Sequence, residues 1–124
     1  MKIKQKALMD IRKHCRMTPK LESCGYLFGE DNHIKSITKG KNLDKSSVYY
    51  TIDPDSTFRS VFRDDFKGVY HSHIGEAIPS SIDESKKKYP DKYYLIYSVS
   101  RDTLRAYFWN GKKFIEEEIE IAED

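Results

Sequence analysis

The stretch VYHSHIGEAIPSSIDE, residues 69–84, constrains the fold more than any other part of the sequence. It begins as a short strand and continues into a loop that contains Gly75 and Pro79. Ser80, followed three residues later by Asp83, is typical of a capped helix N-terminus. The chain must therefore pass from a strand through a short loop, fold back and start a helix.

The same stretch places potential metal ligands close together. Alternate side chains of a strand point to the same face, so His71 and His73 are expected to project side by side, with Ser72 turned away. Two neutral imidazoles suit zinc, and Asp83 on the following helix can supply a third ligand. Three protein ligands leave a fourth tetrahedral position for water, which indicates a catalytic site. Ser80 is placed to stabilise an oxyanion, whereas a general base must come from elsewhere.

The first half of the chain shows both helix and strand patterns. Residues 3–17 carry apolar side chains at intervals of three and four residues, which predicts an amphipathic helix that ends at Thr18-Pro19. Residues 23–38 read as two strands joined by a Gly-Glu-Asp-Asn turn. Residues 48–52 predict a further strand.

Two more helices are predicted in the middle of the chain. Asp53-Pro54 is typical of a helix start, because the acid can cap the helix and proline suits its first position. The helix that begins after Ser80 is expected to run to Tyr89-Pro90 and to expose its lysines to solvent. The expected buried stripe of the first of these helices is Phe58, Val61, Phe62 and Phe66.

The last third of the chain reads as strands. Residues 93–99 are densely apolar, which indicates a central strand. Residues 104–109 and 112–121 flank Asn110-Gly111, a strong signal for a hairpin turn. The whole pattern predicts an α/β (α+β mixed) fold, in which helices pack on a mixed β-sheet.

Length and charge narrow the class of protein. The 124 residues suit a single domain, residues 1–124. Lys and Arg number 22 and Asp and Glu 20, and the one dense basic run, residues 86–88, reads as a solvated helix face, so no nucleic-acid partner is expected. Apolar stretches stay well short of the roughly 18 residues of a membrane span, and the N-terminus lacks a secretory signal. We therefore expect a cytoplasmic protein with no membrane partner.

The remaining cysteines and histidines are assigned structural roles. Cys15 and Cys24 are too few for a disulfide framework and lack the CxxC spacing of a zinc ribbon. They are expected to be reduced and largely buried, although a bridge between them stays open. His14 lies in a charged helix pattern and His33 in a turn, so both are interpreted as surface residues.

A second motif lies far upstream of the histidines. In PKLESCGYLFGE, residues 19–30, Glu22 is followed by Ser-Cys-Gly, an apolar run and a closing glycine. Together with the His-Ser-His motif, this resembles the JAMM (JAB/MPN-type) zinc metalloproteases, in particular their small prokaryotic single-domain members. The resemblance covers nearly the whole chain and implies a cytidine-deaminase-like MPN/JAMM fold. It also implies one zinc ion with a bound water molecule.

The resemblance assigns a role to each residue of the two motifs. It implies Glu22 as general acid/base and Ser80 as the residue that helps to hold the oxyanion. The implied zinc ligands are His71, His73 and Asp83. Six residues separate His73 from Ser80, where the family pattern has seven, and the register of Ser81 with Glu84 would restore that spacing. We prefer Ser80 with Asp83, because Gly75 makes a shorter loop feasible and aspartate is the family's ligand.

The implied reaction is hydrolysis of a peptide or isopeptide bond. The resemblance points to the bond after the C-terminal Gly-Gly of a ubiquitin-like protein, such as a modifier attached to lysine. Residues 42–50 and 74–79 are expected to form the walls of the substrate groove. Processing of a sulfur-carrier precursor that ends in Gly-Gly and a non-catalytic MPN scaffold are the alternatives. The oligomeric state, monomer or homodimer, stays open.

Overall fold

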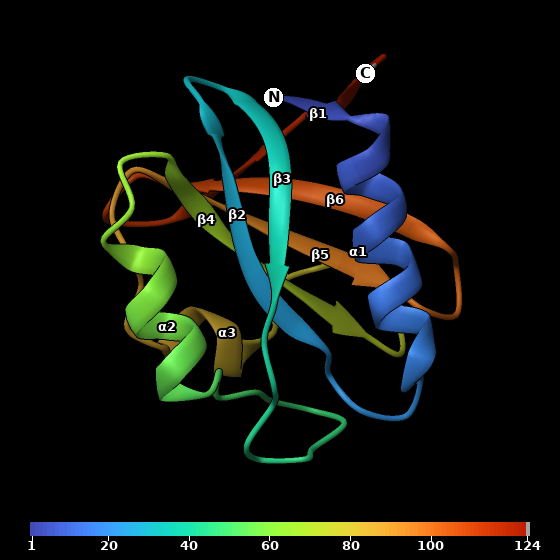
Figure 1. Ribbon diagram of the computed structural model, residues 1–124. Coiled ribbons are helices and arrows are strands. Elements are labelled where there is room, and N and C mark those ends of the chain that lie inside the picture. Colours follow the sequence, from blue (N-terminus) through green and yellow to red (C-terminus); the bar gives the residue numbers. More distant parts are fainter. Residues whose placement is uncertain (124) are drawn as a thin grey trace.

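The computed structural model describes residues 1–123, which form a curled mixed β-sheet and three helices (Figure 1). The strand order is β7-β6-β5-β4-β2-β3-β1-β8. The strands are β1 (Lys2–Lys4), β2 (Cys24–Glu30), β3 (His33–Lys39), β4 (Phe66–His73), β5 (Lys92–Ser98), β6 (Thr103–Trp109), β7 (Phe114–Glu117) and β8 (Glu120–Ala122). The helices are α1 (Gln5–Met17), α2 (Pro54–Val61) and α3 (Ser81–Ser85).

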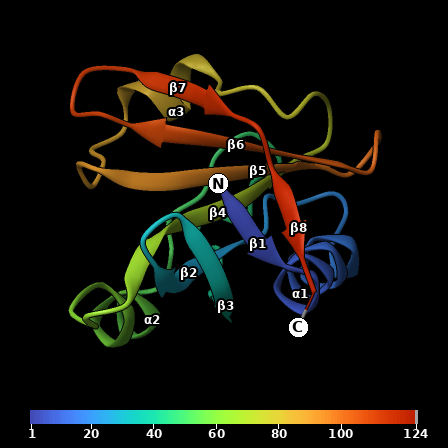
Figure 2. The same cartoon turned by 90° about the horizontal axis from the view of Figure 1, so that it is seen from above.

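The strands at the two ends of the sheet, β7 and β8, follow each other directly in the chain. Strand β7 pairs with β6 at one end, whereas β8 pairs in parallel with β1 at the other end. Only Glu118 and Ile119 separate β7 from β8, so the sheet has to curl until its ends approach each other. Seen from above, the chain runs from β7 directly to β8, beside β1 and the start of α1 (Figure 2). The expectation of a mixed sheet with packed helices is confirmed.

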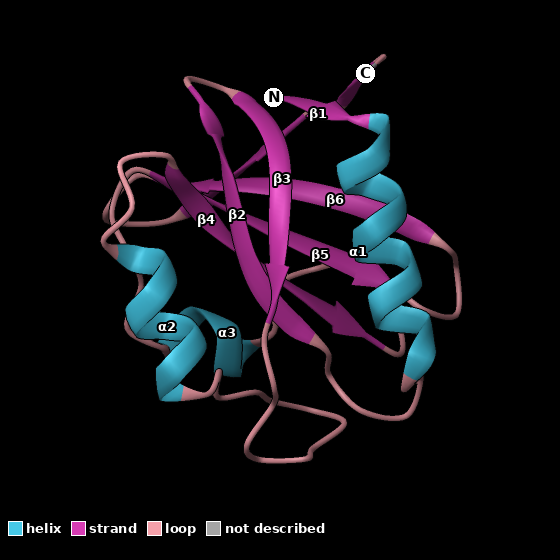
Figure 3. Ribbon diagram, viewed as in Figure 1, coloured by secondary structure: helices cyan, strands magenta, loops and turns pink. Residues whose placement is uncertain are grey.

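Side chains of the central strands alternate between the two faces of the sheet, so each face has its own part of the hydrophobic core. Helix α1 packs its apolar side against one face, which includes Leu27, Tyr70 and Leu95. On the other face, Val69 and its neighbours pack against Val61 of α2. In Figure 3, α1 lies to the right of the sheet, whereas α2 and α3 lie to the left of it. The second face is the one toward which His71 projects, two residues after Val69 on β4.

Two of the predicted helices differ from the observed ones. Helix α1 begins at Gln5 because Ile3 instead pairs in β1 with Ile34 and Ile121. The predicted apolar stripe of α2 is wrong at Phe58 and Phe62, which are 73% and 76% exposed, and at Phe66, which lies in β4. The side of α2 that packs on the sheet carries small polar side chains, since its buried residues are Ser56 and Ser60.

The segment that precedes α2 was also predicted wrongly. Residues 48–52 form no strand, and only Ile52 makes an isolated bridge, to Asn42. The Asn42 side chain holds the segment together, because its amide donates to the Tyr49 carbonyl and accepts from the Thr51 N–H. Backbone groups that a neighbouring strand would satisfy are thus satisfied within the loop.

Helix α3 is shorter than predicted and ends at Ser85. The lysines that follow are therefore not a solvated helix face. Lys86 lies over the ring of Tyr50, and Lys88 lies over the ring of Trp109. Each ammonium group thus folds back onto an aromatic ring, which holds the segment after α3 against the second face of the sheet.

The hairpin at Asn110-Gly111 is confirmed. The Asn110 side chain accepts from the N–H groups of Lys112 and Lys113, and Gly111 adopts a positive φ of 94°. The arm predicted at residues 112–121 is divided between β7 and β8. Within the described residues, no helix is long and apolar enough to cross a membrane.

Candidate metal centre

Strand β4 fixes the two histidines of the motif. It pairs with β2 on one side and with β5 on the other, so its backbone is held by two ladders. His71 is 2% exposed and His73 is half-buried, and their Nε2 atoms lie 3.1 Å apart. Ser72 points to the opposite face, where its hydroxyl accepts from the Ser23 N–H. The two imidazoles thus converge as the strand geometry predicts.

Helix α3 brings an acid to the two histidines through a capping box. The Ser80 hydroxyl accepts from the Asp83 N–H at 3.1 Å, and Asp83 Oδ2 accepts from the Ser80 N–H at 2.9 Å. The same Oδ2 atom lies 3.0 Å from His73 Nε2 and 3.3 Å from His71 Nε2. The cap therefore turns the carboxylate toward the histidine pair. Glu84, the acid of the alternative register, is exposed and lies outside this cluster.

Glu22 approaches the cluster from the connection between α1 and β2. Its backbone N–H donates to the Ser46 carbonyl, and its carbonyl accepts from the side-chain amide of Asn42. Glu22 Oε2 lies 3.7 Å from His73 Nε2, while Oε1 is buried without a hydrogen-bond partner in residues 1–123. Burial raises the pKa of Glu22 to about 7, near the value that suits a group that both takes and returns a proton.

The four residues meet the geometric requirements of a zinc site. Their candidate ligand atoms all lie within 4.8 Å of one another. A tetrahedral ion with bonds of about 2.0–2.1 Å separates its ligand atoms by about 3.3–3.4 Å. The separations among His71, His73 and Asp83 are 3.0–3.3 Å, so a modest expansion admits the ion. The orphaned, buried Asp83 Oδ1 and Glu22 Oε1 also point to a missing partner.

The protonation states of these groups also suit a metal. Burial lowers the pKa of His71, which keeps its imidazole neutral. Burial alone would raise the pKa of Asp83, but hydrogen bonds with His71 and His73 outweigh it and hold this pKa far below its usual range. Zinc requires neutral imidazoles and an ionised carboxylate, which matches His71 and Asp83. Burial alone would lower the pKa of His73, but hydrogen bonds with Asp83 and the Glu76 carbonyl outweigh it and raise this pKa, so zinc would have to displace a proton from this imidazole. His73 Nδ1 lies 3.0 Å from the Glu76 carbonyl and, by donating to it, leaves Nε2 free to coordinate.

A hollow of about 420 Å³ opens beside the cluster. Glu22, His73 and Ser80 lie on its floor, and exposed apolar side chains of Val48 and Ile74 stand on its rim. The two predicted wall segments thus both reach it, through residues 47–48 and 74–76. Of the four residues of the cluster, Glu22 and His73 line this hollow.

The shortened loop after His73 is tied down by the turn between β5 and β6. The Ile74 carbonyl accepts from the Ser100 N–H, and the Ala77 carbonyl accepts from the buried Tyr107 hydroxyl at 2.7 Å. Glu76 and Arg101 form an ion pair at 2.8 Å. These contacts fix the loop beside the hollow, although the loop is one residue shorter than in the family pattern.

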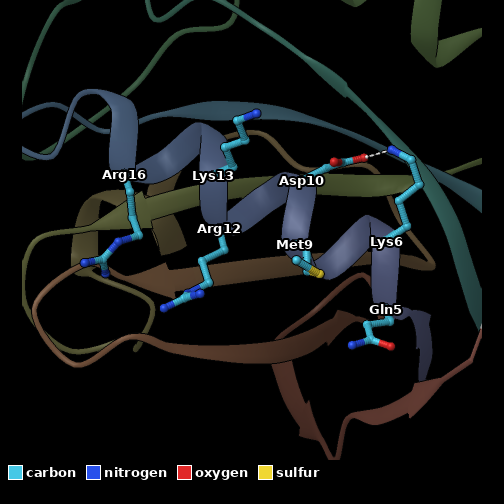
Figure 4. A pocket seen from close by; sticks show the side chains of 7 residues that line it. All are labelled: Gln5, Lys6, Met9, Asp10, Arg12, Lys13 and Arg16. Atoms are coloured by element: carbon cyan, nitrogen blue, oxygen red, sulfur yellow. Dashed lines mark hydrogen bonds and ion pairs between the residues drawn. The ribbon is translucent and has the colours of Figure 1, made fainter.

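A larger hollow, of about 640 Å³, lies along α1 (Figure 4). All of its lining residues come from this one helix, and Figure 4 shows their side chains fanning outward, with Lys6 joined to Asp10. No second element supplies a converging polar group among the residues that line it. We therefore assign no chemistry to this surface.

Some residues outside the motifs differ from expectation. His14 is half-buried, and its Nδ1 lies 2.6 Å from the Tyr70 hydroxyl, so it is not a surface residue. His33 is also partly buried, and its Nε2 lacks a partner in the described chain. Cys15 and Cys24 are free and buried, as expected, and burial raises the pKa of each thiol to about 12. Unreactive thiols of this kind suit packing and not catalysis.

The sequence did not reveal the residues that support Glu22 and His71 from neighbouring segments. Asn42 joins Glu22 to the loop, and the ring of Tyr50 stacks on His71 with centroids 4.5 Å apart. Lys86 covers that ring. These contacts join segments that are distant in sequence, and no local pattern signals them.

Comparison with known proteins places these features in a family. The sequence pattern of the family described as "Prokaryotic homologs of the JAB domain" matches residues 4–110. A desampylase from Pyrococcus furiosus is 31% identical over 77 residues, which are 56% of this chain and 55% of that protein. The chain thus spans about half the length of this curated relative.

Solved structures share the fold over the whole chain. A protein from Desulfitobacterium hafniense, solved in solution, superposes with a TM-score of 0.85 at 25% identity, covering 99% of this chain and 93% of that one. A JAB1/MPN domain protein from Archaeoglobus fulgidus gives 0.66 at 20% identity, covering 99% and 100%. A structure titled as a metalloprotease-like zinc site in the proteasome and signalosome also gives 0.66 at 20%, covering 99% and 98%.

Proposed function

The chain belongs to the prokaryotic homologs of the JAB domain, and on that premise we propose that it is a zinc-dependent peptidase or isopeptidase. Its substrate would be a ubiquitin-like protein, cleaved after a C-terminal Gly-Gly. The proposed zinc ligands are His71, His73 and Asp83, with Glu22 as general acid/base and Ser80 as oxyanion donor.

One observation carries this proposal. A buried carboxylate with an unpartnered oxygen, Glu22, lies within 3.7 Å of a two-histidine, one-aspartate cluster. With Glu22 assigned as the base, the other three residues supply three ligands, so a fourth position is left for a reactant. A structural zinc site would instead surround the ion with four protein ligands and would have no use for a nearby base.

The chain's own residues can then perform the hydrolysis. Zinc, when bound, supplies a Lewis acid that acidifies water and polarises a carbonyl. Glu22 takes a proton from the water as its oxygen attacks the carbonyl carbon, and it gives that proton to the amine nitrogen as the C–N bond breaks. The Ser80 hydroxyl, which uses its oxygen to accept from Asp83 N–H, keeps its own proton to donate to the oxyanion.

The substrate class rests on the relative and on the shape of the hollow. The desampylase relative supports removal of a ubiquitin-like modifier. The hollow is small and its rim is apolar at Val48, Ile74 and Ile82. Glycines at the end of an extended tail would pass beside His73 without side-chain clashes, while residues further from the cleaved bond would meet the apolar rim.

Cleavage of a linear sulfur-carrier precursor would use the same residues and the same tail. A non-catalytic scaffold is the second alternative, and the intact cluster argues against it, because a scaffold has no need of a buried, unpartnered carboxylate. The two enzymatic readings differ only in the amine that leaves, a lysine side chain or a backbone nitrogen.

The test is incubation of the zinc-loaded protein with matched isopeptide-linked and linear Gly-Gly fusions of several ubiquitin-like proteins. We expect cleavage after Gly-Gly that stops with a chelator. Glu22→Gln should keep zinc and lose cleavage, whereas His71→Ala should lose both. Preferred cleavage of the linear fusion would favour the precursor reading, and cleavage retained by Glu22→Gln would remove the assigned base.

Glu84→Gln is the matched control for the acid on α3. Glu84 is exposed and adjacent to Asp83, but it lies outside the cluster. We expect this variant to bind zinc and cleave like the unmodified protein, while Asp83→Asn should lose zinc. The opposite result would select the other register of the motif.

A further inference from the structure

The two histidines of the cluster are held in different ways. His73 can donate its Nδ1–H to the Glu76 carbonyl at 3.0 Å. His71 Nδ1 is buried, yet it has no hydrogen-bond partner within residues 1–123. Metal-binding histidines usually use the second ring nitrogen to fix their orientation. The orientation of His71 must therefore be set by other contacts.

The His71 ring lies face to face with the ring of Tyr50. Their centroids are 4.5 Å apart and their planes are inclined by 27°, which is a stacked arrangement. Tyr50 does not belong to a helix or strand, since it lies in the loop bridged at Asn42 and Ile52. A stacked ring on a loop needs a second contact to hold it in place.

Lys86 provides that second contact. Its Nζ lies 3.7 Å from the centroid of the Tyr50 ring, and it donates a hydrogen bond to the Tyr50 backbone carbonyl. Lys86 directly follows α3, and its N–H bonds to the Ile82 carbonyl in the last turn. The helix that carries Asp83 therefore also fixes the ammonium group that holds Tyr50.

We propose that Lys86 and Tyr50 are positioning residues of the metal centre. Lys86 holds the Tyr50 ring against His71, and the ring keeps the imidazole turned so that Nε2 faces Asp83 and the ion. This inference deepens the proposed function and rests on it for its effect on turnover. Neither residue needs to touch the substrate.

Lys88 offers a matched control for the charge of Lys86. It is also a lysine just after α3, but its Nζ lies 4.3 Å from the Trp109 ring centroid and its hydrogen bonds go to backbone carbonyls of Glu84 and Lys86. It does not contact Tyr50 in the structure. Lys88→Met therefore removes one positive charge from the same region without releasing the stacked ring.

The first experiment measures zinc affinity by competition with a chromophoric chelator. Lys86→Met and Tyr50→Leu should each weaken zinc binding about tenfold, the lower end of the effect of a lost supporting contact. Lys86→Arg and Tyr50→Phe, which keep the cation and the ring, should stay within about twofold of the unmodified protein. Unchanged affinity in Lys86→Met, or an equal loss in Lys88→Met, would overturn the proposal.

A second measurement needs no metal. In the chelated protein, the ring current of Tyr50 should shift the carbon-bound protons of His71 upfield in the NMR spectrum. Lys86→Met and Tyr50→Leu should move these signals downfield while Lys88→Met leaves them in place, and thermal melts confirm that each variant is folded. Unmoved signals in the two test variants refute the positioning role even if cleavage is normal. Zinc binding without cleavage in the unmodified protein refutes the proposed function alone.

Discussion

Replacing Ser80 by alanine separates two roles that its hydroxyl can have. The oxygen accepts a hydrogen bond from the Asp83 N–H at 3.1 Å, which caps α3. A hydroxyl that accepts one bond can still donate its proton, and Ser80 lines the hollow beside Glu22 and His73. Ser80→Ala removes both the cap and the donor. Asp83 keeps its bond from the Ser80 backbone N–H, so zinc should stay bound.

The two losses differ in size and in the quantity they change. Loss of a serine cap costs about 1 kcal/mol of the free energy of unfolding, which lowers the Tm of a chain of this length by roughly 3–5 °C. Loss of an oxyanion donor costs about 3 kcal/mol of transition-state stabilisation, or about 10²–10³ in kcat, with KM nearly unchanged.

The assay pairs a thermal melt with steady-state cleavage of a Gly-Gly fusion by zinc-loaded protein. Ser80→Thr, which keeps a capping oxygen and a donor, should retain most of the Tm and a measurable kcat. Ser81→Ala is the neighbouring control, because Ser81 lines the same hollow without capping the helix. A normal kcat with a lowered Tm would show that Ser80 is only a cap and refute the catalytic reasoning.

Further predictions concern the metal, the loop and the sheet. Zinc at 100 times its Kd should raise the free energy of unfolding by about 2.7 kcal/mol, a gain that a chelator reverses and that His71→Ala lacks. Asn42→Ala removes the amide that bonds to the Glu22 carbonyl and to the loop that carries Tyr50, so kcat and zinc affinity, followed by chelator competition, should each fall about tenfold. Gly68→Ala should destabilise the protein by at least about 3 kcal/mol in urea unfolding. The reason is that Gly68 has a φ of 154° and that an added Cβ would lie 1.8 Å from the Tyr93 carbonyl oxygen. A loss of stability below about 1 kcal/mol would contradict that geometry.

Local patterns predicted the parts of the fold that depend on neighbours in sequence. The strand that ends at His73, the cap at Ser80 and the turn at Asn110-Gly111 all follow from short-range spacing, and all three are present. The common face of His71 and His73 follows from the same rule, since it needs only the two-residue period of a strand. The convergence of the two histidines with Asp83 was expected on these grounds, and the structure brings the three together.

The predictions that failed concern segments in which tertiary packing overrides the local sequence pattern. Phe58 and Phe62 have the spacing of a buried stripe, but α2 turns its serines to the sheet. The lysines after Ser85 look like a solvated helix face, yet two of them fold onto aromatic rings. In both cases the local pattern is a weak guide, and packing against the surrounding elements overrides it.

The sequence by itself determined the strand that carries His71 and His73 and the capped turn that carries Ser80 and Asp83, because these depend on residue type and short spacing. Glu22 was assigned only through the resemblance to the JAMM family. Only the tertiary structure decided that Glu22 comes within 3.7 Å of His73, that the Tyr50 ring stacks on His71, and that Lys86 lies over the Tyr50 ring. Contacts of this kind join residues separated by 21 to 51 positions in the chain. Their geometry depends on how the sheet curls and how the loops close, which no local period encodes.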